Sequence, residues 1–318
     1  METWETTQRR AAEADGARHG RRGSRPDGPR PGRSGLSRAW LLGDRLLGDR
    51  LPGGWPRDLP GGSRLNAAGA VALAAMVAAQ IATGLRPQDL RLTTAVVVLL
   101  AVSALAFAAA AYTPRRAAGA FAAAVAAGYA AEWIGTRTGL PFGDYRYTDA
   151  LWPQPGGVPL IVALAWGGMG LAAHAVARRV APRGRPAPIL AGALALAAWD
   201  LFLDPQMLRL GLWVWAEPGP YRGVPLTNFA GWLLVSVLVM AVLDRLTGRA
   251  AADRPAPGGR GGRVAGTTGL VVLYTVMAVM ETVGFAVVFR PPDPFVAAAG
   301  GLAMGAFVLL AWGRAWRR

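Results

Sequence analysis

The chain has 318 residues, of which 53% are hydrophobic, and a formal net charge of +15. The apolar residues gather in long runs, which is typical of a polytopic membrane protein rather than a soluble one. The lack of cysteine excludes disulfides and thiolate chemistry, and two histidines are too few for a histidine metal site. All 34 basic residues are arginines in the tail and loops, which indicates the flanks of membrane spans and not a nucleic-acid-binding surface.

The N-terminal part of the chain differs in composition from the rest. Residues 1–64 hold 13 arginines among many Gly, Pro, Asp and Ser residues, and such a composition cannot bury a core. We therefore expect a disordered basic tail over 1–64. Residues 65–318 are expected to form the transmembrane domain, with the functional site within 128–232.

Eight apolar segments follow the tail, and most have about the 20 residues that a helix needs to cross a bilayer. The fifth is short, and we expect it to end at Asp204 because Pro205 follows and proline stops a helix. The predicted fold class is all-α, a polytopic integral membrane bundle of about eight transmembrane helices. The expected spans are 66–84, 93–112, 117–134, 157–176, 188–204, 227–244, 266–289 and 295–312.

The arginines predict the orientation of the chain. With the N-terminus in the cytoplasm, the inner loops and the C-terminus carry 14 arginines beyond the tail, and the outer loops carry seven. The positive-inside rule favours this arrangement. We therefore expect a multi-pass protein of the cell membrane with both termini cytoplasmic and the loops after the third and fifth spans on the outer side.

Residues 128–166 and 197–232 share one pattern. Each segment places an acid near the end of an apolar helix, Glu132 in the first and Asp200 in the second, and then crosses an aromatic-rich loop. Each re-enters apolar sequence through Gly-Val-Pro-Leu, which five residues and a tryptophan follow. Both hairpins cross the membrane in the same sense. Spans 3–4 and 5–6 are therefore predicted to be parallel repeats about an axis roughly along the membrane normal.

Four acids are the candidate catalytic residues, because an acid inside a span is unfavourable and usually functional. Glu132 could donate a proton, or it could pair with an arginine of the next loop. Asp200 and Asp204 share one helix face and could be an acid–base pair, a metal pair or helix-end caps. The sequence supplies no second Asp-rich cluster, so we expect no metal. Glu281 could serve the same site, since three outward-running helices each carry an acid in their outer half, or it could bond to a neighbouring helix.

Aromatic side chains concentrate beside these acids. Interfacial Trp and Tyr are common in membrane proteins. Aromatic faces can also line a slot for a flat polyene and stabilise a cation by about 1–2 kcal/mol. Asn228 could orient a water or cap its helix. The candidate substrate-binding residues are Trp133, Tyr145, Tyr147, Trp166, Trp199, Trp213, Trp215, Tyr221, Asn228 and Trp232.

The chain resembles the membrane carotenoid biosynthesis family, which includes bisanhydrobacterioruberin hydratase and γ-carotene 1′,2′-hydratase. The strings that carry the resemblance lie within about 128–232, in the family order: E-W-I-G-T-R-T-G-L-P-F-G-D-Y-R-Y-T, G-V-P-L before Trp166, W-D-L-F-L-D-P-Q-M, W-V-W and Y-R-G-V-P-L-T-N-F-A-G-W. The basic tail departs from the family pattern. The resemblance implies a carotenoid hydratase that adds water to the terminal 1,2 double bond of an acyclic carotenoid without a redox cofactor. Its partners would be the polyene, water, membrane lipid and other enzymes of the pathway.

Three other functions fit parts of the pattern. A membrane prenyltransferase would use the spacing of Asp200 and Asp204 to hold magnesium, but it also needs a second Asp-rich motif. A lycopene cyclase-like enzyme would share the protonation step and then lose a proton instead of adding water. A non-catalytic carotenoid or lipid carrier would use the same slot without converting its ligand.

Overall fold

The computed structural model describes residues 61–182, 184, 186–253 and 266–316. Within these residues, eight helices are long and apolar enough to cross a membrane, so the predicted multi-pass all-α fold is confirmed. Residues 1–60 of the expected tail lie outside the described part. Its last four residues, 61–64, already belong to the first helix.

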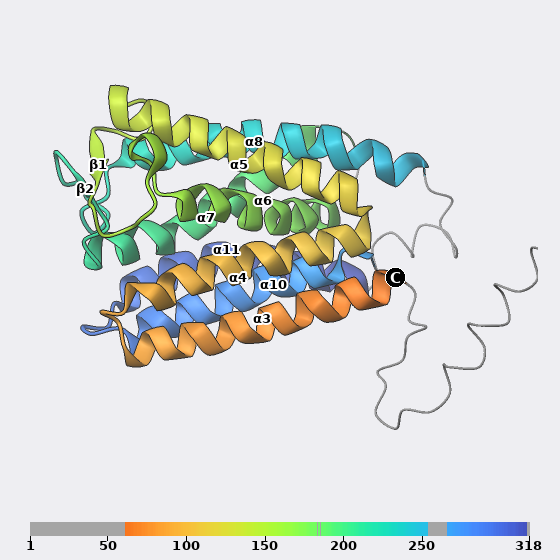
Figure 1. Ribbon diagram of the computed structural model, residues 1–318, viewed down its shortest axis with the longest axis horizontal. Coiled ribbons are helices and arrows are strands. Elements are labelled where there is room, and N and C mark those ends of the chain that lie inside the picture. The colour runs from red at the N-terminus through yellow and green to blue at the C-terminus, as the bar shows by residue number, and fades with distance from the viewer. Residues whose placement is uncertain (1–60, 183, 185, 254–265, 317–318) are drawn as a thin grey trace, which may run out of the picture. The chain divides into compact units, whose positions relative to one another are not determined.

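Consecutive long helices run in alternating directions, and the paired strands lie at the end of the bundle opposite to the end of α11 (Figure 1). The elements are α3 (Gly61–Leu85), α4 (Leu90–Ala111), α5 (Pro114–Thr138), β1 (Tyr145–Tyr147), the 3₁₀ turn η1 (Pro155–Gly157), α6 (Leu160–Val180), α7 (Pro186–Arg209), β2 (Trp213–Trp215), α8 (Leu226–Asp253), α10 (Thr268–Val283), the π-helical turn η2 (Gly284–Val288) and α11 (Pro294–Trp316).

Helix α6 lies at the centre of the bundle. It packs against α4, α5, α7, α8, α10 and α11, and most of its residues are buried. Its sequence is rich in glycine and alanine, and such small residues let helix backbones approach closely. The centre of the fold is therefore a helix that neighbours surround on every side.

Helix α7 does not end before Pro205, contrary to the prediction, but continues to Arg209. A proline has no N–H, so the carbonyl of Leu201 loses its donor within the helix. The hydroxyl of Tyr221 donates to this carbonyl at 2.9 Å. A side chain from the following loop thus satisfies the group that the proline leaves free, as happens in membrane helices that contain proline.

The two similar segments build the hairpins α5–α6 and α7–α8. Helices α6 and α8 both begin at the leucine of their Gly-Val-Pro-Leu string. Strand β1 of the first loop pairs antiparallel with β2 of the second, and Tyr145 lies opposite Trp215. The tryptophans that follow the two strings, Trp166 and Trp232, stack with ring centroids 4.2 Å apart. Equivalent parts of the two hairpins therefore meet each other, as parallel repeats about a shared axis would.

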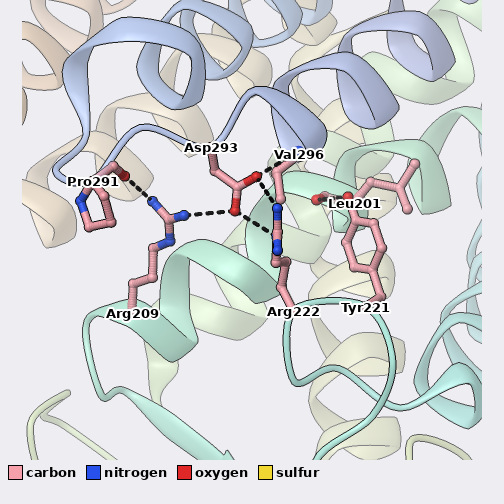
Figure 2. A network of polar contacts seen from close by, with 7 residues as sticks. All are labelled: Leu201, Arg209, Tyr221, Arg222, Pro291, Asp293 and Val296. Atoms are coloured by element: carbon pink, nitrogen blue, oxygen red, sulfur yellow. Dashed lines mark hydrogen bonds and ion pairs between the residues drawn. The ribbon is translucent and has the colours of Figure 1, made fainter.

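Asp293 links three segments near the end of the bundle where β1 and β2 lie (Figure 1). Figure 2 shows the contacts of its side chain. Its carboxylate binds Arg209 of α7 at 2.8 Å and Arg222 of the α7–α8 loop at 2.8 and 2.9 Å. It also accepts the backbone N–H of Val296 at 3.2 Å, which caps α11. Arg209 donates in addition to the carbonyl of Pro291. We call this group the Asp293 clasp.

Candidate active site

The carboxyl group of Glu132 is buried near the end of α5, where its side chain is 4% exposed. It accepts three hydrogen bonds: a short one from the hydroxyl of Tyr145, one of 2.8 Å from the hydroxyl of Tyr147 and one of 3.0 Å from Nε1 of Trp166. The donors come from β1 and α6. Both oxygens of the carboxyl group are therefore held in a fixed orientation.

Glu132 forms no ion pair with an arginine of the next loop in the part of the chain that is described. Arg137 instead lies over the ring of Trp133, 4.1 Å from its centroid, and donates to the carbonyl of Gly156 at 3.0 Å. The alternative of a simple interfacial ion pair is therefore wrong for this residue.

Two glycines on the same face of α5 make room for the donors. Gly128 lies one turn before Glu132 and Gly135 about one turn after it. A Cβ atom at Gly128 would stand 2.3 Å from Cγ of Trp166, and one at Gly135 would stand 3.0 Å from the hydroxyl oxygen of Tyr145. Both positions need glycine, because larger side chains would push these donors away from the carboxyl group.

The two tyrosines remain donors over a wide range of pH. Burial, together with the nearby Glu132 carboxyl, raises the pKa of the Tyr145 and Tyr147 hydroxyls above the usual value for tyrosine. Both hydroxyls therefore keep their protons in neutral and moderately alkaline solution.

A second acidic group lies where α7 meets α8. The side-chain amide nitrogen of Asn228 donates to Oδ2 of Asp200 at 3.0 Å and makes a short hydrogen bond to Oδ2 of Asp204. All three residues are buried. Oδ1 of Asp200 has no hydrogen-bond partner among the described residues. Asn228 lies inside α8 rather than before its first residue, so it holds the two carboxyls together instead of capping the helix.

A small buried cavity lies between the two acidic groups. Its volume is about 20 Å³, and one water needs roughly 10–15 Å³. Carboxyl groups from both hairpins reach it, since Glu132 and Asp204 line it together with Asn228. The rest of the wall consists of Phe142, Tyr145, Tyr147, Val162, Leu203, Trp213, Trp215 and Trp232.

Comparison with known proteins shows the family to which the chain belongs. The profile of the carotenoid biosynthesis proteins matches residues 93–304, which include every residue of both acidic groups. The chain belongs to the carotenoid biosynthesis protein family. Bisanhydrobacterioruberin hydratase of Haloarcula japonica is 32% identical over 136 residues, which are 41% of this chain and 45% of that protein. The chain thus aligns with less than half of that relative's length. No solved structure matches the chain.

In this family member, Glu281 does not share the small cavity, so the expectation of one cavity for three acids is wrong. Glu281 lines a separate cavity of about 390 Å³, together with Trp199. The reason lies in the packing: α10 packs against α3, α4, α6 and α11, whereas α5 packs against α4, α6 and α8, so Glu132 and Glu281 lie on helices that are not direct neighbours.

Three predicted substrate-binding residues line neither cavity: Trp133, Tyr221 and Trp166. Trp133 directly follows Glu132, so it points about 100° away around α5 and is 42% exposed. Tyr221 is occupied by its hydrogen bond to the carbonyl of Leu201. Tyr145, Tyr147, Trp213, Trp215, Asn228 and Trp232 line the small cavity as expected, and Trp166 stands behind Glu132 and Trp232.

Several lining residues were not among the predicted ones. Phe142, Val162 and Leu203 complete the wall of the small cavity. Val162 and Leu203 are apolar side chains inside apolar helices and give no chemical signal in the sequence, whereas Phe142 lies in the loop between α5 and β1. Gln80 and Thr93 line the larger cavity. These two do carry a signal, because polar side chains within spans are unfavourable unless they are used.

Proposed function

We propose that this protein is a carotenoid hydratase that adds water across the terminal 1,2 double bond of an acyclic carotenoid end group. The observation that carries the proposal is the water-sized cavity between Glu132 and Asp204, with six aromatic side chains in its wall. Membership of the family and the similarity to a named hydratase support a carotenoid-modifying role.

The reaction balances without a redox partner. The π electrons of the trisubstituted alkene take a proton at C2, which forms a C2–H bond and leaves a tertiary cation at C1. The oxygen of water then bonds to C1, and one water proton passes to a carboxylate. The product is a tertiary alcohol, and the site regains the proton that it gave. Such a reaction needs an acid, a base, one held water and shelter for the cation.

We assign the proton donor to the pair of Asp200 and Asp204. Asn228 holds both carboxyls within hydrogen-bond reach of one nitrogen. Two like charges this close in a dry site cannot both be ionised, so the pair carries a proton that it can transfer.

We assign the water-positioning base to Glu132. Both of its oxygens accept hydrogen bonds from O–H and N–H groups, which is the arrangement of an ionised carboxylate. Its negative charge would face the cation at C1 and lower the energy of the transition state. The aromatic rings of the wall add cation–π stabilisation, which reaches about 2 kcal/mol in dry sites.

Expression of the full chain in a bacterium that makes lycopene, γ-carotene or another carotenoid with an acyclic end group tests the proposal. We expect mass analysis to show pigments heavier by one water for each end that reacts. A cyclised isomer of unchanged mass would indicate a cyclase, and magnesium-dependent addition of a prenyl group would indicate a prenyltransferase. Unchanged pigment from every precursor, with well-inserted protein, would overturn the proposal.

Substitution of the acids tests the assignment of roles. Glu132→Gln and Asp200→Asn keep the shape of the side chain and remove the titrating group. Positioned acid–base catalysis is worth roughly 10²–10⁴ in rate, so both variants should insert normally and lose most of the hydration activity. The control is Glu217→Gln, in an exposed loop residue outside both cavities, which should act like the wild type. Near-full turnover by both acid variants would show that these carboxyls serve only the architecture.

A further inference from the structure

The larger cavity lies between α3, α4, α7, α10 and η2, and its volume of about 390 Å³ falls in the range of small-molecule sites, roughly 300–1,000 Å³. Most of its wall is apolar. Four of its lining residues, Ile81, Leu85, Val283 and Val288, are also exposed on the outer surface of their helices. The cavity therefore opens sideways between α3 and the α10–η2 segment, on the apolar surface that would face lipid.

Three polar groups in this wall lack partners within the residues that the structure describes. The carboxyl group of Glu281 makes no hydrogen bond or ion pair there, although its side chain is only 7% exposed. Oγ1 of Thr93 and Oε1 of Gln80 are also buried without a hydrogen-bond partner. The amide nitrogen of Gln80 reaches only Sδ of Met277, at 3.6 Å. Buried polar groups are normally paired, so a carboxyl group, an amide oxygen and a hydroxyl left unpaired in one apolar cavity indicate a ligand that can both donate and accept a hydrogen bond.

The cavity adjoins the water-sized cavity across α7. Asp200 and Asp204 lie on one face of the helix, whereas Trp199 and Gln206 point into the larger cavity. Leu203 lies between these faces and lines both cavities. A second pair of aliphatic side chains completes the partition: Val97 lines the larger cavity, Val162 lines the smaller one, and both pack with Leu203 against one hydrophobic cluster. The edge-to-face pair of Trp199, from the larger wall, and Trp232, from the smaller one, also lies between the two spaces, with ring centroids 6.3 Å apart.

We propose that the larger cavity binds the hydroxyl-bearing end of an acyclic isoprenoid chain. The hydroxyl donates its one hydrogen bond to the Glu281 carboxyl or to Oε1 of Gln80 and accepts one from the hydroxyl of Thr93, while the apolar chain lies along the wall toward the lateral opening. We identify this ligand as the alcohol that hydration produces, and this identification rests on the proposed function. The preference for a hydroxyl rests only on the groups of the cavity itself. Glu281 is then a binding residue and not a proton donor.

Binding of two matched pigments tests this proposal. The probes are lycopene and its monohydrated derivative, 1-hydroxy-1,2-dihydrolycopene, added to the purified full chain in detergent, with the pigments recovered afterwards to confirm their masses. A hydrogen bond in a buried site is worth about a three- to tenfold difference in affinity. We expect the alcohol to bind the wild type more tightly than lycopene by about this factor.

Variants separate the hydroxyl site from a general effect on packing. Glu281→Leu and Thr93→Val should bring the ratio of the two affinities toward one and leave the affinity for lycopene unchanged. Glu281→Gln, which keeps an acceptor oxygen, should retain the preference. The matched control is Thr282→Val: Thr282 is the next residue of α10, does not line the cavity, and bonds within its own helix to the carbonyl of Ala278. It should leave the ratio at its wild-type value.

The outcomes distinguish this proposal from the proposed function. Equal affinity of the wild type for both pigments, or a preference that survives Glu281→Leu and Thr93→Val together, would overturn the hydroxyl site even if hydration occurs. Loss of hydration in Glu281→Gln at unchanged alcohol preference would make Glu281 catalytic and would also contradict the proposal. If no precursor is hydrated and the preference for the alcohol is still measured, the hydratase proposal fails and the hydroxyl site stands.

Discussion

The hydroxyls of Tyr145 and Tyr147 both donate hydrogen bonds to the carboxyl group of Glu132, whereas residue 146 between them points to the other face of the strand. Alternation along a strand places residues two apart on the same face. Strand β1 therefore aims two donors at Glu132, and its partner β2 brings Trp213 and Trp215 to the same side. A three-residue strand is enough to fix one side of the candidate site.

Tyr147→Phe tests the importance of one of these donors. The change keeps the ring in place and removes a hydrogen bond to a carboxylate, and such bonds are worth about 1.5–3 kcal/mol. If the bond holds Glu132 in its reactive orientation, hydration should slow by about tenfold or more at normal insertion. Initial rates of alcohol formation in membranes provide the measurement.

Tyr129→Phe is the matched control for that change. Tyr129 lies on α5 as Glu132 does, but its hydroxyl donates to the carbonyl of Pro155 and it lines neither cavity. Removal of the Tyr129 hydroxyl should leave the rate of hydration close to that of the wild type. Equal rates for Tyr147→Phe and the wild type would show that Tyr145 and Trp166 orient Glu132 without help.

At the scale of elements, the contact between α5 and α6 depends on the absence of a side chain. Trp166 of α6 lies against Gly128 of α5, donates to Glu132 and stacks on Trp232 of α8. One glycine thus lets the first hairpin reach the second. The stack of the two repeat tryptophans and the orientation of the carboxyl group depend on the same close approach.

We expect Gly128→Ala to disturb this contact. The new Cβ would stand 2.3 Å from Trp166, so the indole must move, and such overpacking costs about 1–3 kcal/mol. Thermal stability in detergent should fall, the near-ultraviolet circular dichroism of the stacked tryptophans should change, and hydration should be lost or strongly reduced.

Gly119→Ala lies on the same helix and serves as the comparison. A Cβ atom there meets nothing within 4 Å. Alanine favours a helix by about 1 kcal/mol over glycine, so this variant should be at least as stable as the wild type. A loss of similar size in both variants would mean that the effect comes from the α5 backbone and not from Trp166.

At the scale of the molecule, the Asp293 clasp joins the end of α7, the α7–α8 loop and the start of α11 (Figure 2). Burial acts to raise the pKa of Asp293, but its hydrogen bonds to Arg222 and Val296 and the charges of Arg222 and Arg209 outweigh it and hold the pKa below the usual range. The clasp therefore stays ionised at neutral pH.

Asp293→Asn should destabilise the protein by about 1–2 kcal/mol at neutral pH, since Arg222 is partly exposed and its pairing is weakened by solvent. Because the pKa is lowered in the folded state, the stabilisation by the carboxylate is complete above the unfolded-state pKa of about 3.9. It disappears as the pH falls through the lower pKa of the folded state. The stability difference between wild type and variant, measured by thermal unfolding in detergent, should therefore shrink in strongly acidic buffer. A difference that stays constant with pH would mean that the clasp acts by shape and not by charge.

The orientation in the membrane is also a property of the whole molecule. The paired strands lie at the end of the bundle opposite to the end of α11 (Figure 1). The 14 to seven distribution of arginines predicts that this end faces away from the cytoplasm. The chain has no native cysteine, so single cysteines at Glu217 and Arg115, both exposed, give clean probes. An impermeant reagent should label Glu217→Cys in intact cells and Arg115→Cys only after lysis. If instead Arg115→Cys is labelled in intact cells and Glu217→Cys only after lysis, the orientation is the opposite of the predicted one.

The fold class could be predicted from the amino-acid sequence, because the length of each hydrophobic segment is a local property of the chain. The same sequence made Glu132, Asp200, Asp204 and Glu281 the candidate catalytic residues, because an acid in an apolar span stands out wherever it lies. The duplicated Gly-Val-Pro-Leu strings indicated two similar hairpins before any contact between them was known.

Which of these residues contact one another could not be predicted, because it depends on how the helices pack. The exclusion of Glu281 from the small cavity follows from the packing of α10 on α3 and α4, which no pattern within α10 encodes. The continuation of α7 past Pro205 depends on a hydroxyl from Tyr221, sixteen residues later in the chain. Local sequence sets what each segment can form, whereas the partners that satisfy its polar groups come from segments that the fold brings together.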